Sequence, residues 1–201
     1  MIESKRDYLY YLEADRIALK KDYDKPNLFY DETWKFQRLL RKVEYIKNCK
    51  KGFFFKLYME YLNLMLYRKQ LKLHIHVFPN CFGPGLSISH AGTMGVNGDA
   101  VIGDNCRIHN CVIIGSDVRD SNKVPKIGNN VYIGPGAKIY GDVVLADNIA
   151  VGANSVVEKS FLETGITIAG VPARKVSDRG SRGFIIEATK ILKERGENRG
   201  C

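Results

Sequence analysis

The chain has 201 residues, and 45% of them are hydrophobic, so it can form one large or two small domains with a buried core. Its net charge of +9 lies mainly in residues 1–72, where 17 Lys and Arg face 10 Asp and Glu, whereas residues 73–176 carry eight of each. The neutral middle segment argues against a nucleic-acid groove there. The excess of Lys and Arg in residues 1–72 indicates helix faces exposed to solvent, with at most a peripheral contact to anionic lipid.

Cysteine usage and hydropathy indicate a cytoplasmic protein. No apolar signal region follows the polar start of the chain. The most apolar stretch, residues 52–67, is interrupted by Lys56 and Glu60, so it is too short and too charged to span a bilayer. The five cysteines form an odd set without a Cys-x-x-Cys pair, which favours reduced thiols.

Residues 1–72 show helical periodicity. Apolar residues at helical spacing predict a first helix that ends near Tyr23. A second helix follows Asp31, which can cap it, and a third follows Gly52. The third helix is apolar on more than one face, which predicts burial against other helices or another subunit.

A six-residue repeat then governs the chain. An aliphatic or aromatic residue starts each hexad, at Phe82, Ile88, Val96, Ile102, Ile108, Ile114, Ile127, Ile133, Ile139, Leu145, Val151 and Val157. Two steps are longer, with two extra residues after Ile88 and seven after Ile114. The period is too short for a helical repeat and too long for strand alternation. It fits a coil of three short strands, stacked at the spacing of paired strands, about 4.8 Å.

The residues between the starts support tight corners in this coil. Three positions after most starts the chain has Gly, Asn or Asp, which tolerate a left-handed backbone at low cost: Gly85, Asp99, Asn105, Asn130, Gly136, Asp142, Asn148 and Asn154. Cys106 falls at an inward position of the coil. The long step within Ser116–Lys126 is polar, and we expect it to be expelled as a loop, where function is often found.

These patterns predict an all-β solenoid of about four coils over residues 73–176. A helical domain, residues 1–72, precedes it, and residues 177–201 follow as a C-terminal helix and tail. Within that tail, residues 183–194 are typical of a short amphipathic helix, and residues 198–201 are expected to fray.

Several motifs carry a family resemblance. The hexads, the expelled loop, Ile133–Lys138 and the closing Ala169–Arg174 together resemble the hexapeptide-repeat acyltransferases. The helical domain before the coil makes the chain look like serine acetyltransferase. The segment Phe82–Gly92 looks most like the branch found in capsule and exopolysaccharide gene clusters. The resemblance implies a left-handed parallel β-helix that forms a homotrimer, with acetyl-CoA bound between neighbouring subunits; the pairing of two trimers through residues 1–72 is left open.

His90 is the candidate catalytic residue. It lies two residues after Ile88, in the step with two extra residues, so it can project from a corner of the coil. Transfer of an acyl group from a thioester to an alcohol needs a base for the hydroxyl proton and an acid for the departing sulfur. An imidazole with an ordinary pKa of about 6.5 suits both steps near neutral pH. With the resemblance, His90 is expected to be the general base.

The resemblance also assigns the acetyl-CoA site, position by position. Small residues that let the pantetheine arm approach the backbone match Gly115, Pro135, Ala137 and Ala153. Basic residues that meet the nucleotide phosphates match Lys159 and Arg174. The hexad itself demands many small residues, so a purely structural role for Gly115 and Ala137 is an equal alternative.

The residues around His90 depart from the serine acetyltransferase pattern. That family has Asp directly before the catalytic His and Arg-His-Pro in the expelled loop, whereas this chain has Ser89 and Lys123-Val124-Pro125. The family's carboxylate in the preceding coil is also missing from the matching stretch, 74–76. These changes favour a neutral sugar hydroxyl, in surface polysaccharide biosynthesis, over free serine, which remains the alternative. His74, a backbone carbonyl or a partner-subunit group could orient His90.

Two further alternatives complete the interpretation. A non-catalytic trimeric scaffold or binding module would explain the hexads, but not the expelled loop or the closing Gly-x-Pro-Ala-Arg segment. No metal is expected, because no carboxylate or cysteine lies at a spacing that would complete a zinc site with His74, His76 and His90. His109 occupies a position where Gly is usual, and we expect it only to line a groove.

Overall fold

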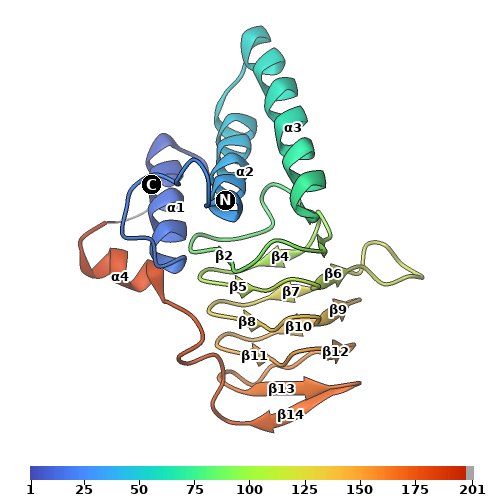
Figure 1. Ribbon diagram of the computed structural model, residues 1–201. Coiled ribbons are helices and arrows are strands. Elements are labelled where there is room, and N and C mark those ends of the chain that lie inside the picture. The colour runs from blue at the N-terminus through green and yellow to red at the C-terminus, as the bar shows by residue number, and fades with distance from the viewer. Residues whose placement is uncertain (198–201) are drawn as a thin grey trace.

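The computed structural model describes residues 1–197, and the end that was expected to fray lies outside them. Three helices lie above a stack of short strands, and a fourth helix lies beside the first (Figure 1). The helices are α1 (Lys5–Ala18), α2 (Glu32–Cys49), α3 (Phe53–Leu73) and α4 (Ala188–Glu194).

The strands form three sheets that the chain visits in rotation. They are β1 (Ile75–Val77), β2 (Ser87–Ile88), β3 (Met94–Val96), β4 (Val101–Ile102), β5 (Arg107–Ile108), β6 (Ile113–Gly115), β7 (Lys126–Ile127), β8 (Tyr132–Ile133), β9 (Lys138–Tyr140), β10 (Val144–Leu145), β11 (Ala150–Val151), β12 (Val156–Val157), β13 (Thr167–Gly170) and β14 (Ala173–Ser177). The first sheet is β1-β3-β6-β9-β12, the second β4-β7-β10, and the third β2-β5-β8-β11-β13-β14. All pairs are parallel except β13 with β14.

This rotation makes the chain a three-sided coil, as the six-residue period predicts (Figure 1). Ile88, Ile108, Ile133 and Val151 lie directly above one another in the third sheet, and all four are fully buried. Each buried Ile or Val contributes about 1.5–3 kcal/mol relative to exposure. The hand of the coil stays a prediction from the resemblance.

The core is continuous from the coil into the helices. Phe36 and Leu40 of α2 and Leu62 of α3 belong to the same buried cluster as the inward residues of the coil. Cys106 is buried at its inward position, and burial raises the pKa of its thiol to about 12. The described cysteines form no disulfide.

A ladder of asparagines turns one corner of the coil. Asn105, Asn130 and Asn148 have φ values of 55°, 56° and 62°, in the left-handed region that the sequence predicts for these positions. The side-chain amide of Asn105 donates to Asn130 at 2.9 Å, and that of Asn130 donates to Asn148 at 3.0 Å. The ladder ties consecutive coils together in a backbone conformation that most residues avoid.

The helices differ from the sequence-based expectations in three places. Helix α4 begins at Ala188 rather than at residue 183. Helix α1 ends at Ala18 rather than near Tyr23. Asp31 stands at the N-cap position of α2, but its carboxylate accepts no bond from that helix. It accepts bonds from Lys21 Nζ, Tyr23 Oη and the backbone N–H of Asn27 instead. Asp31 therefore orders the connection between α1 and α2.

The predicted loop after Ile114 is expelled from the coil. It leaves β6 at Gly115, rejoins the stack at β7, and extends to one side (Figure 1). Two backbone hydrogen bonds, Asp117 N–H to Lys123 O and Lys123 N–H to Asp120 O, shape it from within. The loop therefore has a defined form, and only its end packs on the coil, where Val124 and Pro125 are buried.

Helix α3 presents a row of exposed apolar side chains. They are Phe53, Phe54, Leu57, Tyr61, Leu64, Tyr67 and Leu71, each at least 48% exposed. Within residues 1–197, no helix is both long enough and apolar enough to cross a membrane. An exposed apolar row of this size on a protein surface is typical of a contact surface.

The asparagine ladder gives a stability test. Asn130→Ala places a Cβ-bearing residue without a compensating amide in the left-handed region, which costs about 1–2 kcal/mol in addition to the lost side-chain bonds. Asn130→Gly loses the same bonds but adopts that backbone freely. Denaturant unfolding should therefore rank wild type above Asn130→Gly, and Asn130→Gly above Asn130→Ala. An alanine variant as stable as the glycine variant would contradict this account.

Candidate active site

His90 lies where the coil departs from its period. The wider turn between β2 and β3 contains it, and two backbone bonds fix that turn against the end of α3: Gly92 N–H to Leu73 O at 3.0 Å and Met94 N–H to His74 O at 2.9 Å. His90 is exposed, and the described residues give its ring no hydrogen bond. The imidazole is therefore held by its backbone and open to a ligand.

His109 is the nearest histidine to His90. It lies one coil further along, and the two ring centroids are 5.9 Å apart with an interplanar angle of 51°. Burial, and then the nearby charges of Arg107 and His90, lower the pKa of His109 below its ordinary value. His109 is therefore predominantly neutral at neutral pH. Its ring can accept or donate a hydrogen bond beside His90 without adding a second charge.

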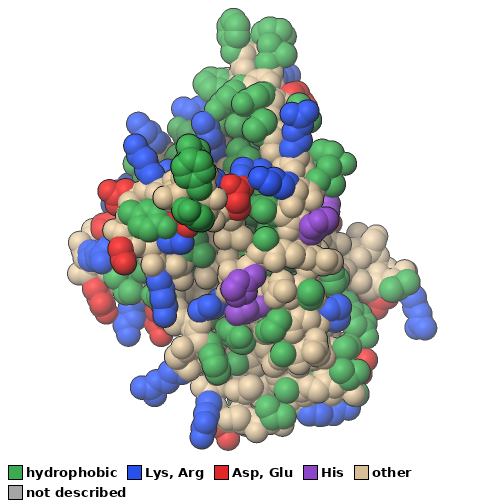
Figure 2. All heavy atoms as spheres, viewed as in Figure 1, with side chains coloured by type: hydrophobic (Ala, Val, Ile, Leu, Met, Phe, Trp, Pro, Cys, Tyr) green, Lys and Arg blue, Asp and Glu red, His purple; other side chains and the backbone are tan. Residues whose placement is uncertain are grey.

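Ser89 links His109 to Arg107. Arg107 Nε donates to Ser89 Oγ at 3.0 Å, and the same hydroxyl oxygen lies 3.4 Å from His109 Nε2. Figure 2 shows histidine side chains together on the visible face, at the level of β2 and β5, with Lys or Arg side chains beside them. The sequence analysis did not identify Arg107. One sequence signal could have indicated Arg107. Side chains two residues apart along a strand point to the same face, so Arg107 is expected on the same outer face as His109.

Aromatic rings extend the group formed by Ser89, Arg107 and His109 along the third sheet. Tyr132 meets His109 edge-on at 5.2 Å between centroids, and Phe184 lies 4.9 Å from Tyr132. Arg107 Nη1 donates to the carbonyl of Phe184 at 3.3 Å. The segment between β14 and α4 thus returns to the face that carries the histidines.

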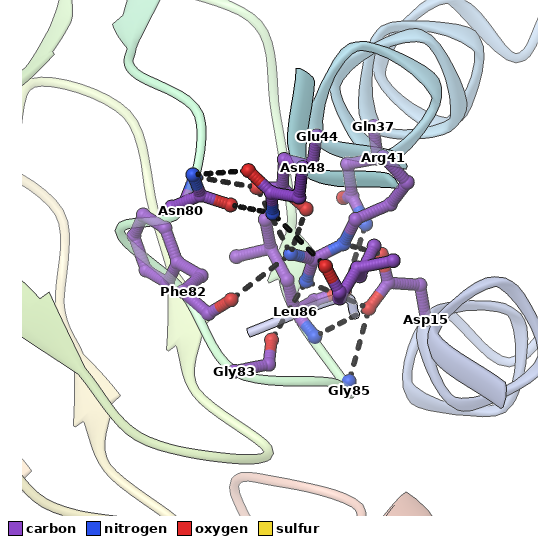
Figure 3. Close-up of polar contacts among 11 residues, drawn as sticks. Asp15, Gln37, Arg41, Glu44, Asn48, Asn80, Phe82, Gly83, Gly85 and Leu86 are labelled. Carbon is purple, nitrogen blue, oxygen red and sulfur yellow. Dashed lines mark hydrogen bonds and ion pairs between the residues drawn. The ribbon is translucent and has the colours of Figure 1, made fainter. Parts of the chain in front are cut away.

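A buried ionic network fixes the chain just before His90 (Figure 3). Arg41 of α2 is fully buried and donates to Asp15, to Glu44, and to the carbonyls of Phe82 and Gly83. One guanidinium faces two carboxylates, and backbone N–H groups supply the remaining donors. A buried ion group of this kind is stable only when its members are all hydrogen-bonded.

The same network holds the turn that leads into β2. Asp15 Oδ1 accepts the backbone N–H groups of Gly85 and Leu86, both at 2.9 Å. Gln37 donates to the carbonyl of Leu86 at 2.8 Å and accepts from the N–H of Ile88 at 2.9 Å. Side chains of α1 and α2 therefore determine the path of the backbone up to two residues before His90. Local sequence patterns do not reveal this network, because its members lie far apart in the chain and resemble ordinary helix residues.

The predicted coenzyme residues occupy two different corners of the coil. Pro135 and Ala153 stack in the turns between the third and first sheets, the corner that also carries His90, and Asn154 N–H donates to Pro135 O at 2.9 Å. Gly115 is the last residue of β6 and Lys159 follows β12, so both lie where the chain leaves the first sheet. We call these the His90 corner and the loop corner. One face of the coil separates them.

The remaining coenzyme candidates differ in their surroundings. Ala137 is fully buried, so its methyl group packs inside the coil. Arg174 is exposed on β14 and donates to the carbonyl of Ala173. A Cβ at Gly115 would meet only Ile113 Cγ2, at 4.0 Å, so packing within the chain does not require glycine there. Among residues 1–197, no three His, Cys, Asp or Glu side chains gather as metal ligands would.

Comparisons with known proteins point to one group of enzymes. Residues 125–159 match the family described as bacterial transferase hexapeptide (six repeats). The chain is 31% identical over 121 residues to a serine acetyltransferase of Synechococcus elongatus, covering 59% of this chain and 49% of that protein. It is 34% identical over 110 residues to a serine acetyltransferase of Staphylococcus epidermidis, covering 54% and 51%. The chain therefore spans about half the length of the curated relatives it matches.

Solved structures agree over a larger part of the chain. The serine acetyltransferase of Neisseria gonorrhoeae superposes with a TM-score of 0.68 at 26% identity, covering 88% of this chain and 68% of that one. The serine acetyltransferase of Brucella abortus in complex with coenzyme A gives a TM-score of 0.67 at 25% identity, covering 87% and 68%. The likeness includes the helical part as well as the coil.

These findings correct the sequence-based assignment of the acceptor. The expected sugar hydroxyl, and with it the capsule and exopolysaccharide branch, is wrong, because the relatives are named serine acetyltransferases. The preference for a sugar rested on groups absent at Ser89, in Lys123-Val124-Pro125 and in residues 74–76. The structure places the charged side chain of Arg107 beside Ser89.

The buried network gives a second test. Arg41→Met leaves two buried carboxylates without their cation, which should lower the free energy of unfolding by about 3–5 kcal/mol. Arg38→Met on the same helix is the matched control, because Arg38 is partly exposed and lies outside the network. Chemical denaturation measures both variants. Equal stability of the two would show that the network does not hold the helices on the coil.

Proposed function

We propose that the protein is an acetyl-CoA-dependent O-acetyltransferase that acts on free serine. The observation that carries this proposal is an exposed imidazole, without a hydrogen bond from its own described chain, at the widened turn of a coil similar to serine acetyltransferases. Acetyl-CoA is the co-substrate in this proposal, in keeping with the relative solved in complex with coenzyme A. The assignment of serine rests on the relatives' names.

His90 acts as the general base in the proposed reaction. Its neutral imidazole accepts the serine hydroxyl proton as the hydroxyl oxygen forms a bond to the acetyl carbonyl carbon. The tetrahedral intermediate then collapses with cleavage of the carbon–sulfur bond, and the imidazolium returns the proton to the departing sulfur. Such proton transfer typically contributes about 10²–10⁴-fold to the rate. Transfer is direct, and no group of the protein is acylated.

The coenzyme site is proposed to include Gly115, Pro135, Ala137, Ala153, Lys159 and Arg174. Open space beside Gly115 and the exposure of Pro135 and Ala153 fit the close approach of an extended ligand to the backbone. Ala137 would contribute through its backbone, because its methyl group points into the core. The exposed Lys159 and Arg174 are proposed to meet phosphates.

The division of the proposed coenzyme residues between the His90 corner and the loop corner supports a trimer. Six residues separate His109 at the His90 corner from Gly115 at the loop corner, or about 20 Å of extended strand. In a closed trimer the His90 corner of one chain can face the loop corner of its neighbour, so a ligand with its reactive end beside His90 and its arm beside Gly115 would bridge two chains. Outward apolar side chains, among them Val101, Ile113 and Tyr140, are available for burial between coils. Closed threefold packing would bury them without open-ended association.

Helix α3 is proposed to make a further contact between copies. Its exposed apolar row belongs to the helical part of the chain, whose place above the coil Figure 1 shows. Burial of this row against another copy would remove the largest exposed group of aromatic side chains. This contact would pair trimers through residues 1–72.

The proposal is tested at His90. His90→Ala should lower serine-dependent release of CoA from acetyl-CoA by about 10²–10⁴-fold, because the hydroxyl loses its base. His76→Ala is the matched control: His76 is an exposed histidine on β1, and its replacement should leave the rate unchanged. Size-exclusion chromatography should give the same elution volume for both variants. A His90→Ala rate within twofold of wild type would remove the proposed base, and absence of serine turnover by wild type would overturn the function.

A further inference from the structure

A small cavity adjoins the residue next to His90. Its volume is about 160 Å³, and it lies between the end of α1, the start of α2 and strands β2 and β5. The lining residues are Ala18, Leu19, Lys20, Lys21, Thr33, Ser87, Ile88, Ser89 and Arg107. Ser89 forms part of the wall, and it directly precedes the proposed base in the chain.

The charges of this cavity are all of one sign. Lys20, Lys21 and Arg107 line it, and no Asp or Glu does. Lys21 is neutralised by Asp31, whose Oδ1 lies 2.5 Å from its Nζ. Lys20 and Arg107 have no carboxylate partner among residues 1–197. The cavity therefore offers two uncompensated cations together with the hydroxyls of Thr33, Ser87 and Ser89.

The position of Arg107 is set by two bonds that leave one amino group available. Its Nε donates to Ser89 Oγ at 3.0 Å, and its Nη1 donates to the carbonyl of Phe184 at 3.3 Å. No partner within residues 1–197 is recorded for Nη2. A guanidinium held in this way loses little freedom when it binds an anion, and bonds from a guanidinium to a carboxylate are about twice as strong as neutral ones.

We infer that this cavity binds the carboxylate of the acceptor, with Arg107 as the specificity-determining residue and Lys20 as a second cation. The inference rests on the proposed function and extends it to the recognition of serine. In serine the carboxyl carbon is two carbon–carbon bonds from the carbon that bears the hydroxyl. A carboxylate beside Ser89 and Arg107 and a hydroxyl beside the adjacent His90 therefore suit an acceptor of this length.

The lining also indicates that the cavity does not recognise the ammonium group of an acceptor. No carboxylate lines the wall to meet an ammonium group, and Ser89 stands where the resemblance expects Asp. Selection between acceptors should therefore depend on the carboxylate far more than on the ammonium group. The acceptor class is a short hydroxy acid, of which serine is one member and glycerate, which lacks the ammonium group, is another.

The turnover experiment compares three acceptors in the full-length protein. They are L-serine, ethanolamine, which lacks the carboxylate, and glycerate, which lacks the ammonium group. Wild type should prefer serine over ethanolamine in kcat/KM by at least about 10²-fold and should accept glycerate within about tenfold of serine. Arg107→Gln should raise KM for serine by about 10–100-fold, with kcat and KM for acetyl-CoA little changed, because a charged hydrogen bond is removed. Arg107→Lys should recover part of the loss.

A binding experiment tests the cavity without turnover. Calorimetric titration of wild type with glycerate should show binding that Arg107→Gln weakens by at least about tenfold and that ethanolamine does not reproduce. Titration with inorganic phosphate distinguishes a carboxylate site from a general anion site, because phosphate binding tighter than glycerate binding would overturn the assignment. Arg182→Gln, an exposed arginine outside the cavity lining, is the matched control and should behave as wild type.

The outcomes separate this inference from the proposed function. Serine turnover that Arg107→Gln leaves unchanged overturns the inference and leaves the function standing. Equal losses of kcat/KM for serine and ethanolamine in Arg107→Gln would show that Arg107 acts only through the fold. A rise confined to KM for acetyl-CoA would assign Arg107 to the coenzyme. Either result overturns the inference. Wild type that binds glycerate through Arg107 but does not acetylate serine would support the anion site and overturn serine as substrate. Absence of glycerate binding to wild type overturns the anion site.

Discussion

The rest of the structure depends on one packing constraint: every sixth residue must be an apolar side chain that fits inside a narrow three-sided coil. Ile88, Ile108, Ile133 and Val151 meet this constraint in direct register, and the parallel backbone bonds between coils follow from it. Because each coil repeats the one before, a side chain at a given place in the hexad lies above its counterpart in the next coil. Residues that are 18–25 positions apart thereby become neighbours, as Ser89 and His109 are.

The second determinant is the fit of the helices on the first coil. A coil has open ends, and the end near β2 is covered by α1 and α2 through Arg41, Asp15 and Gln37. These side chains satisfy backbone groups of the turn 82–88 that no preceding coil could reach. The buried ions thus form the boundary between helix and coil, and His90 follows directly from the turn that they hold. Stability and the position of the proposed base are linked at this point.

The sequence predicted much of the coil and little of the site around His90. Local chemistry was sufficient for the strands, the left-handed Asn130, the expelled loop and the exposure of His90, because each depends on residues within one hexad. The network of Arg41 depends on contacts between residues 26 to 71 positions apart, which no local pattern records. Arg107 was missed for a similar reason, since its bond to Ser89 exists only when β5 lies beside β2. The wrong preference for a sugar rested on groups absent at single positions, among them Ser89.

The proposed reaction combines these elements: an exposed imidazole, a rigid turn behind it and a cationic cavity beside it. The most direct test uses acetyl-CoA labelled in the acetyl group, with wild-type protein and serine, and mass spectrometry of both the small molecules and the protein. The account predicts labelled acetyl on the serine hydroxyl, in an amount equal to the CoA released, with no label on the protein. CoA release without acetylserine, or labelled acetyl retained on a side chain such as His90, would contradict direct transfer to serine.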